Sequence, residues 1–157
     1  NLRRHGIAVY GTFVFGYEND DLDSFDRAVD FALQEDMYIA AFNHLTPFPA
    51  TPLYDRLKGE GRLRFESWWL DAAYRYNDLP YHPGKLSPAA VTQGCVAARS
   101  RFYGWRSIAK RAWRNRSDFF MFRNYLPINL MHQREVSLRN GYPLGDESWH
   151  GTLLEVA

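Results

Sequence analysis

Two apolar runs on either side of an amphipathic stretch dominate the first third of the chain. Residues 6–16, GIAVYGTFVFG, are rich in β-branched and aromatic side chains and are bounded by glycines, which predicts a buried strand. One face of this strand is more apolar than the other, so one face could line a cavity while the other packs on helices. The less apolar face carries Ala8, Tyr10, Thr12 and Val14, and the more apolar face carries Val9, Phe13 and Phe15.

The stretch between the two apolar runs has the spacing of a helix. Its apolar residues recur at helical intervals over residues 22–35, and Asp20 or Asp21 can cap its start. The second run, residues 37–45 (MYIAAFNHL), predicts another strand. Because strand, helix and strand in this order are typical of a βαβ unit, we expect two parallel strands joined by a right-handed crossover.

Three prolines follow the second strand, in residues 45–54 (LTPFPATPLY). Ligands of parallel α/β proteins bind at the carboxyl ends of strands, where this loop lies. Proline fixes φ and lacks an N–H donor, so the loop is expected to be a rigid rim with free carbonyls that could shape a ligand site. A rigid connector without a ligand is the alternative. Thr51 and Pro52 predict the start of a short helix that ends at Gly59 or Gly61.

The rest of the chain predicts an irregular segment followed by helices. Residues 64–86 have no clean period, whereas Ser87 and Pro88 repeat the cap-and-proline start of a helix, with an interruption expected near Gly104. A further helical pattern starts at residues 117–118 and contains Pro127 as a kink. The predicted domains are residues 1–63, an irregular linker of residues 64–86, and a helical accessory domain of residues 87–157.

Charge is balanced over the whole chain but separated along it. The net charge of +1 gives no global case for nucleic acid or membrane binding. Residues 18–36 hold eight acidic residues and one basic residue, whereas residues 79–117 hold eight basic and no acidic residues. These opposite charges favour docking of the two segments on each other or on a further partner. No run approaches the ~20 apolar residues that span a bilayer.

Candidate reactive side chains are few. Cys95 is the single cysteine, so a disulfide is excluded, a reduced, cytoplasmic location is expected, and a buried, inert thiol is predicted. The five histidines show no metal-ligand spacing. His44, near a strand end, is a candidate for substrate contact or proton transfer, with ordinary hydrogen bonding as the alternative.

The basic segment of residues 99–116 combines seven basic residues with four aromatic ones. As a helix it could lie on an anionic membrane surface or bind phosphates. The alternative is a helix that packs through its aromatic side chains while its arginines pair with acidic surface elsewhere.

Residues 1–63 resemble the last two strand–helix units of radical S-adenosylmethionine enzymes, in the subfamily with an amino-terminal cobalamin-binding domain. Such enzymes carry a phrase like TPYPGTPLY where this chain has PFPATPLY at residues 47–54. The stretch RFYGWRSI, residues 101–108, also resembles the helical carboxyl-terminal extension of that subfamily.

The resemblance implies an α/β fold: two parallel βα units of a partial (β/α)6 TIM-like barrel, followed by a mostly α-helical extension. It implies that the adenine of S-adenosylmethionine lies against a Gly-x-Ile-x-Gly-like segment of the first strand and against the end of the second. Ala50 stands where the family has a glycine, which implies a backbone that avoids left-handed angles there. The cofactor-binding residues implied by this match are Thr12, Val14, Gly16, Asn43, Thr46 and Pro47.

The cluster-binding part of that family is missing from the chain. The family holds a [4Fe–4S] cluster with three cysteines, and Cys95 alone cannot do so. The chain is therefore expected to be the carboxyl-terminal part of such an enzyme, inactive alone, with cobalamin as a further candidate cofactor. Its expected partners are the amino-terminal remainder of the same polypeptide and a small-molecule or lipid substrate. The alternative is a free-standing α/β module whose basic helix binds nucleic acid or an anionic membrane surface.

Overall fold

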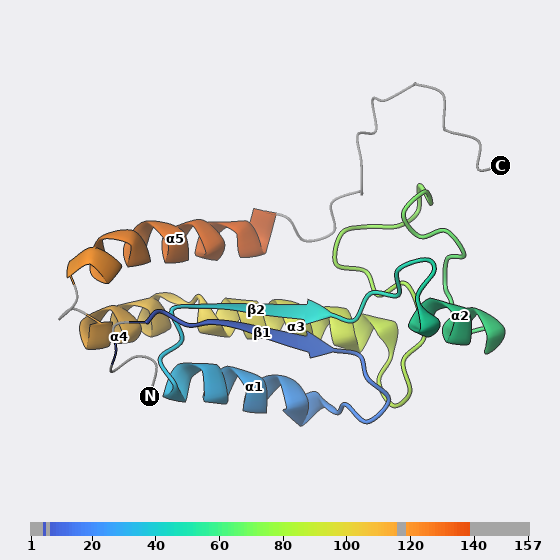
Figure 1. Cartoon of the computed structure of the whole chain (residues 1–157), viewed down its shortest axis with the longest axis horizontal. Coiled ribbons are helices and arrows are strands. Elements are labelled where there is room, and N and C mark those ends of the chain that lie inside the picture. Colours follow the sequence, from blue (N-terminus) through green and yellow to red (C-terminus); the bar gives the residue numbers. More distant parts are fainter. Residues whose placement is uncertain (1–4, 6, 116–118, 139–157) are drawn as a thin grey trace, which may run out of the picture.

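A pair of parallel strands surrounded by helices forms the centre of the molecule (Figure 1). The computed structural model describes residue 5, residues 7–115 and residues 119–138. Both strands point toward α2 and the irregular segment after it (Figure 1). In chain order the elements are β1 (Tyr10–Phe15), α1 (Leu22–Gln34), β2 (Ile39–His44), α2 (Pro52–Gly59), α3 (Pro88–Phe102), α4 (Trp105–Asn115) and α5 (Phe119–Leu138).

The two strands pair in parallel, as the sequence predicts, in a register that runs from Tyr10 opposite Ile39 to Phe15 opposite His44. The more apolar face packs on the helices, where Phe13 stacks on Phe42 with ring centroids 5.1 Å apart. The α/β class is confirmed. Two strands do not make a barrel, so the partial (β/α)6 barrel stays a prediction.

Helix α1 starts where the acidic turn predicts. Asp21 caps it, since its carboxylate accepts a hydrogen bond from the Ser24 amide at 2.8 Å and the Ser24 hydroxyl accepts one from the Asp21 amide. Asp20 instead closes the preceding turn by accepting a bond from the Gly16 amide at 2.8 Å. The buried side of α1, made of Phe25, Val29 and Ala32, meets the apolar face of the sheet.

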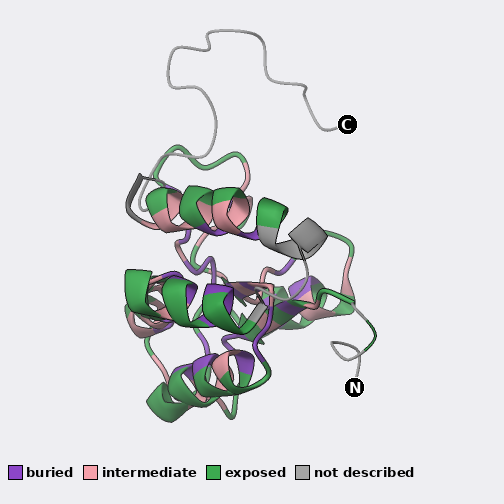
Figure 2. Cartoon of the chain, turned by 90° about the vertical axis from the view of Figure 1, so that its left-hand side faces the viewer, coloured by how far each residue is buried: buried purple, intermediate pink, exposed green. Residues whose placement is uncertain are grey.

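Helix α3 packs on both α1 and β2, and its buried side belongs to the same core as the strands. Ser87 caps it by accepting a bond from the Ala90 amide at 3.1 Å. The helix ends at Phe102 and α4 begins at Trp105, so the break expected near Gly104 is confirmed. Figure 2 shows the buried residues of the helices turned inward and the exposed ones outward. Residues beyond the predicted linker therefore share one core with the strands, and the division into domains stays a prediction.

The acidic and basic segments dock on each other. Arg101 of α3 pairs with Asp26 of α1 at 3.0 Å and also bonds Asp30, and Arg114 of α4 pairs with Asp36 at 2.9 Å. These pairs confirm the first of the two expected arrangements, in which the two charged segments dock on each other rather than on a further partner. They also favour the packed form of the basic helix, because several of its charges are matched within the chain.

The segment between α2 and α3 is irregular but well packed. Among residues 60–87, one antiparallel bridge joins Leu63 to Tyr81. Trp68, Tyr74 and Leu79 are buried, so aromatic packing takes the place of regular secondary structure.

The proline loop differs from expectation in two ways. Its carbonyls are not all free, because Pro47 accepts a bond from the Trp68 indole at 3.0 Å and Phe48 accepts one from the Thr51 hydroxyl at 2.6 Å. Ala50 has a φ of +60°, so the expectation that it avoids left-handed angles is wrong. We attribute this to the Thr51 cap of α2, whose side chain also accepts from the Tyr54 amide at 3.3 Å and fixes the direction of the chain.

No helix within residues 7–115 and 119–138 is long and apolar enough to cross a bilayer. The cytoplasmic location expected from the single cysteine stays a prediction.

Candidate functional site

The sheet face that turns away from the core is open and carries half of the predicted cofactor-binding residues. Val14 lies beside Asn43 in the strand register, and Thr12 lies two residues before Val14 on the same face. Thr12 and Asn43 are exposed, and Val14 is 38% exposed. Parallel sheets normally have both faces covered, so an open face of mixed polarity is a candidate binding surface.

The other three predicted residues lie at the strand ends, where their backbones serve the fold. The Gly16 carbonyl accepts a bond from the buried Tyr81 hydroxyl at 2.6 Å. A Cβ added at Gly16 would come within 2.6 Å of the Tyr81 hydroxyl oxygen. Pro47 is buried beneath the irregular segment. Thr46 is half-buried, with its hydroxyl 3.4 Å from a ring nitrogen of His44. Gly16, Thr46 and Pro47 therefore lie just beyond the strand ends, and their cofactor role stays a prediction.

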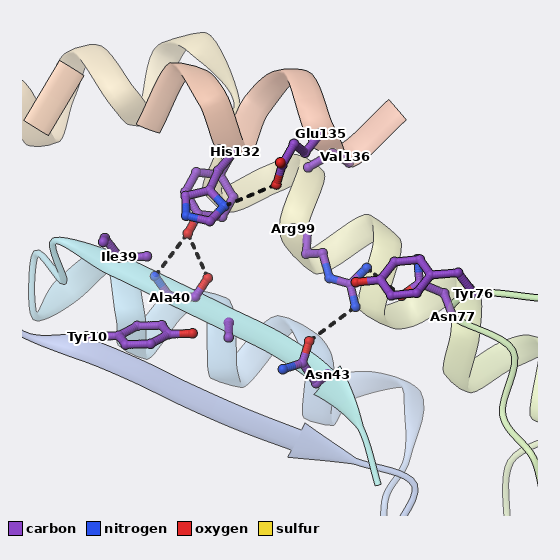
Figure 3. A pocket seen from close by; sticks show the side chains of 12 residues that line it. Tyr10, Ile39, Ala40, Asn43, Tyr76, Asn77, Arg99, His132, Glu135 and Val136 are labelled. Carbon is purple, nitrogen blue, oxygen red and sulfur yellow. Dashed lines mark hydrogen bonds and ion pairs between the residues drawn. The ribbon is translucent and has the colours of Figure 1, made fainter. Parts of the chain in front are cut away.

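A pocket of about 200 Å³ opens between β2, α3 and α5 (Figure 3). Arg99 projects into it from α3. Its Nε donates to the Phe42 carbonyl at 2.9 Å, Nη1 donates to the Asn77 side-chain oxygen at 3.0 Å, and Nη2 lies 3.4 Å from the Asn43 side-chain oxygen. The pocket therefore adjoins the open face at Asn43, one of the predicted residues. Sequence reasoning missed Arg99, which carries no signal beyond its place in the basic segment.

The far side of this pocket is built by α5. His132 stacks on the Tyr103 ring with centroids 4.9 Å apart, and its Nδ1 lies 4.0 Å from the Glu135 carboxylate. The Tyr103 hydroxyl donates to the Ala40 carbonyl at 2.8 Å. Burial raises the pKa of Tyr103 to about 12, so this hydroxyl stays protonated and acts as a hydrogen-bond partner rather than as an acid.

The two edges of the sheet differ in whether their backbone groups are hydrogen-bonded to other elements. Backbone groups on the outer edge of β2 are bonded by helix side chains, because Tyr103 bonds both the N–H and the C=O of Ala40 and Arg99 bonds the Phe42 carbonyl. The preceding Tyr38 carbonyl accepts a bond from the Asn129 amide at 3.2 Å. This edge is closed to a further strand.

The outer edge of β1 is open within the part of the chain that the structure describes. The Val9 carbonyl accepts a bond from the Ile39 amide at 3.4 Å, and the Phe15 carbonyl accepts one from the Leu45 amide at 2.7 Å. These bonds show that the odd-numbered residues of β1 face its partner. The backbone groups of Tyr10, Thr12 and Val14 therefore face away from β2, and no bond joins them to another described element.

A second pocket, of about 240 Å³, lies near the carboxyl ends of the strands, where Gly16 contributes to its wall. The charges of Arg56 and Arg62 in its wall are matched by two carboxylates. Glu18 lies 3.2 Å from Arg62 and 3.8 Å from Arg56, and Glu60 lies 2.8 Å from Arg62 and 4.0 Å from Arg56. This balance gives no reason to expect a charged ligand there.

His44 lines neither pocket. Burial lowers the pKa of its imidazole below the ordinary value, so the ring is neutral near pH 7, and its role in substrate contact or proton transfer stays a prediction. Cys95 is buried and its pKa is raised to about 12 by burial, which confirms the predicted inert thiol. No group of His, Cys, Asp and Glu among the described residues is arranged to hold a metal ion.

Comparison with known proteins finds similarity to two methyltransferases of Chlorobaculum tepidum. The chain is 31% identical over 126 residues to bacteriochlorophyllide d C-12(1)-methyltransferase, which covers 80% of this chain and 26% of the relative. It is 23% identical over 115 residues to bacteriochlorophyllide d C-8(2)-methyltransferase, which covers 73% of this chain and 25% of that relative. The chain thus spans about a quarter of the length of these curated relatives. No protein-family model and no solved structure matches the chain.

These relatives correct the family assignment made from the sequence. Both are named as bacteriochlorophyllide methyltransferases, and neither name refers to radical chemistry, an iron–sulfur cluster or cobalamin. The assignment to radical S-adenosylmethionine enzymes of the cobalamin-binding-domain subfamily is therefore wrong on this comparison, and the [4Fe–4S] cluster and cobalamin are unsupported. The alternative of a module that binds nucleic acid or a membrane surface through residues 99–116 is not supported either, since both relatives are named as methyltransferases and not as binding proteins.

Proposed function

We propose that the chain is part of an S-adenosylmethionine-dependent methyltransferase that acts on a bacteriochlorophyllide-like tetrapyrrole. The observation that carries this proposal is the 31% identity to bacteriochlorophyllide d C-12(1)-methyltransferase over 80% of the chain. An α/β unit with an open sheet face beside the strand ends is a suitable scaffold, because ligands of such folds bind at the carboxyl ends of strands.

The open sheet face suits the methyl donor. Val14 offers an apolar contact for an adenine ring, whereas Thr12 and Asn43 offer a hydroxyl and an amide at the surface of the same face. Gly16, Thr46 and Pro47 would form the rim at the strand ends. When bound, S-adenosylmethionine supplies the methyl group, and the role of this chain is to bind and orient it.

The free edge of β1 suits a further strand of the same polypeptide. Because the β2 edge is closed by Tyr103 and Arg99, growth of the sheet is possible at β1 alone. The relatives are almost four times as long as the part that this chain matches, which is ample for additional strands. A third strand at β1 would extend the sheet toward the proposed partial barrel, with Thr12 and Val14 turned to its interior.

Hydrogen exchange tests this extension of the sheet. In the isolated chain, the amides of Gly11 and Phe13 should be protected by β2, whereas those of Thr12 and Val14 should exchange fast. In the full protein all four should be protected. Fast exchange of Thr12 and Val14 there would refute the third strand without bearing on methyl transfer.

The activity is tested with the full protein, methyl-labelled S-adenosylmethionine and a bacteriochlorophyllide. We expect label in the pigment and a product heavier by one methylene. Asn43→Ala should weaken binding of the methyl donor by roughly tenfold, which is the loss of about one hydrogen bond. Gln34→Ala, an exposed amide at the end of α1, is the matched control and should leave binding unchanged. Absence of labelled pigment would refute the proposed function.

A further inference from the structure

We propose that Arg99 binds a carboxylate of the substrate in the pocket between β2, α3 and α5. This inference rests on the proposed function and adds to it a substrate-binding residue and the chemical class of the group that it binds. It starts from the surroundings of the Arg99 charge, which differ from those of the charges on Arg101 and Arg114.

The charge of Arg99 has no carboxylate partner among the described residues. Arg101, two residues later, bonds Asp26 and Asp30, and Arg114 bonds Asp36. The acceptors of Arg99 are the Phe42 carbonyl and two side-chain amides, all neutral. These bonds hold the half-buried guanidinium in place without neutralising it, which leaves a full positive charge at the pocket wall.

Donors remain available for a ligand. A guanidinium has five N–H groups, and the bonds to Phe42, Asn77 and Asn43 use three of them. One N–H is left on each terminal nitrogen, which is the number that a carboxylate takes from arginine in a two-point contact. The pocket also contains the Glu135 carboxylate, but this group lies against His132 and is not in ion-pair contact with Arg99.

The size and lining of the pocket indicate what else the ligand carries. About 200 Å³ is less than the roughly 300–1,000 Å³ of sites that enclose a whole drug-sized ligand, so the pocket admits an acidic side arm rather than a large ring. Tyr10 and Tyr76, which are 63% and 40% exposed, present aromatic surface at its mouth (Figure 3). A flat conjugated ring with a carboxylate-bearing arm fits both features, because the ring can contact these tyrosines while the arm reaches Arg99. A chlorophyllide is such an acid.

The test compares a tetrapyrrole acid with its ester. Pheophorbide a and its methyl ester are titrated separately against the full chain, with quenching of tryptophan fluorescence as the readout. The acid should bind roughly 10- to 100-fold more tightly than the ester, as expected for a charge-assisted bond. Arg99→Gln should weaken binding of the acid to the affinity of the ester and leave the affinity of the ester unchanged. Arg99→Lys should retain part of the preference for the acid. Arg106→Gln, at an exposed position on α4, is the matched control and should behave like the wild type.

The outcomes separate this inference from the proposed function. Equal affinities for acid and ester in the wild type overturn the carboxylate pocket but leave tetrapyrrole binding and methyl transfer standing. Retention of the acid preference in Arg99→Gln also overturns it. If neither compound binds and no labelled pigment forms in the methyl-transfer assay, both proposals fall. Should Arg99→Gln not fold, the wild-type comparison of acid with ester still decides the question.

Discussion

Removal of one oxygen atom from Tyr103 should destabilise the molecule out of proportion to its size. The Tyr103 hydroxyl closes the outer edge of β2, because it donates to the Ala40 carbonyl at 2.8 Å and accepts from the Ala40 amide at 3.2 Å. Both residues are buried, with 3% and 2% of their surface exposed. In Tyr103→Phe the ring stays, and the N–H and the C=O of the buried Ala40 lose their partner.

The expected loss follows from those two groups. A buried donor or acceptor left unsatisfied costs about 1–3 kcal/mol, so with two such groups we expect Tyr103→Phe to lower the free energy of unfolding by about 2–6 kcal/mol. For a chain of this length that corresponds to a fall of roughly 4–24 °C in melting temperature. The loss is a large fraction of the ~5–15 kcal/mol that stabilises an ordinary domain.

Urea unfolding followed by tryptophan fluorescence measures this difference. Tyr17→Phe is the matched control: the same atom is removed from a side chain that is 54% exposed, and its stability should stay within about 0.5 kcal/mol of the wild type. If Tyr103→Phe were as stable as Tyr17→Phe, at an unchanged denaturant slope, the account of the closed β2 edge would be refuted.

Four further substitutions test individual positions. Ala50→Gly should raise stability by about 0.5–1 kcal/mol, because glycine adopts the φ of +60° without the strain of a side chain, and an unchanged melting temperature would count against that backbone. Gly94→Ala should lower stability by about 1 kcal/mol or more, since its Cβ would come within 2.5 Å of the Phe25 ring, whereas Gly59→Ala, with open space around it, should gain up to ~1 kcal/mol. Because burial lowers the folded pKa of His44 below its ordinary 6.5, the unfolded chain protonates first as pH falls, so unfolding free energy should decrease below about pH 6.5. His44→Gln should flatten that pH dependence in melts at pH 7.5, 6.5 and 5.5. If the variant kept the wild-type slope, a group other than His44 would be its cause.

Much of the fold could be predicted because its signals act over a few residues. Asp21 and Thr51 cap their helices through bonds to amides three residues later, and Gly104 lies at the break between α3 and α4. Alternation along the first apolar run likewise identified the face of β1 that meets the helices. Such features depend on local backbone geometry, which the sequence specifies without knowledge of the tertiary structure.

The pocket could not be predicted, because it depends on contacts between distant residues. Arg99 reaches Asn43 and Asn77, which lie 56 and 22 residues away along the chain. Asn77 comes from the segment that has no periodic pattern, so nothing in the sequence indicates its position. The packing of that segment is set by long-range aromatic contacts, such as that of Trp68 with Tyr74.

The incorrect family assignment has a physical explanation in the proline loop. Its phrase matched a known family, but the groups that make the phrase distinctive serve the turn: Pro47 accepts a bond from Trp68, and Thr51 caps α2. A loop sequence of this kind specifies a backbone shape, and many chemistries can be built beside one shape. The relatives carry the chemical information because their similarity extends over most of this chain.

Asn43 joins the two halves of the proposed site. Its side chain lies beside Val14 on the open sheet face, where we place the methyl donor, and its amide oxygen lies 3.4 Å from Arg99, where we place the substrate carboxylate. A carboxylate bound to Arg99 and a methyl donor bound to Asn43 would meet at this contact between the two side chains, so the two ligands should affect each other's binding. Such a coupling is reciprocal, because each ligand must change the affinity of the other by the same factor. The closed β2 edge supports this arrangement, since Arg99 and Tyr103 fix the strand that carries Asn43 between the two ligands.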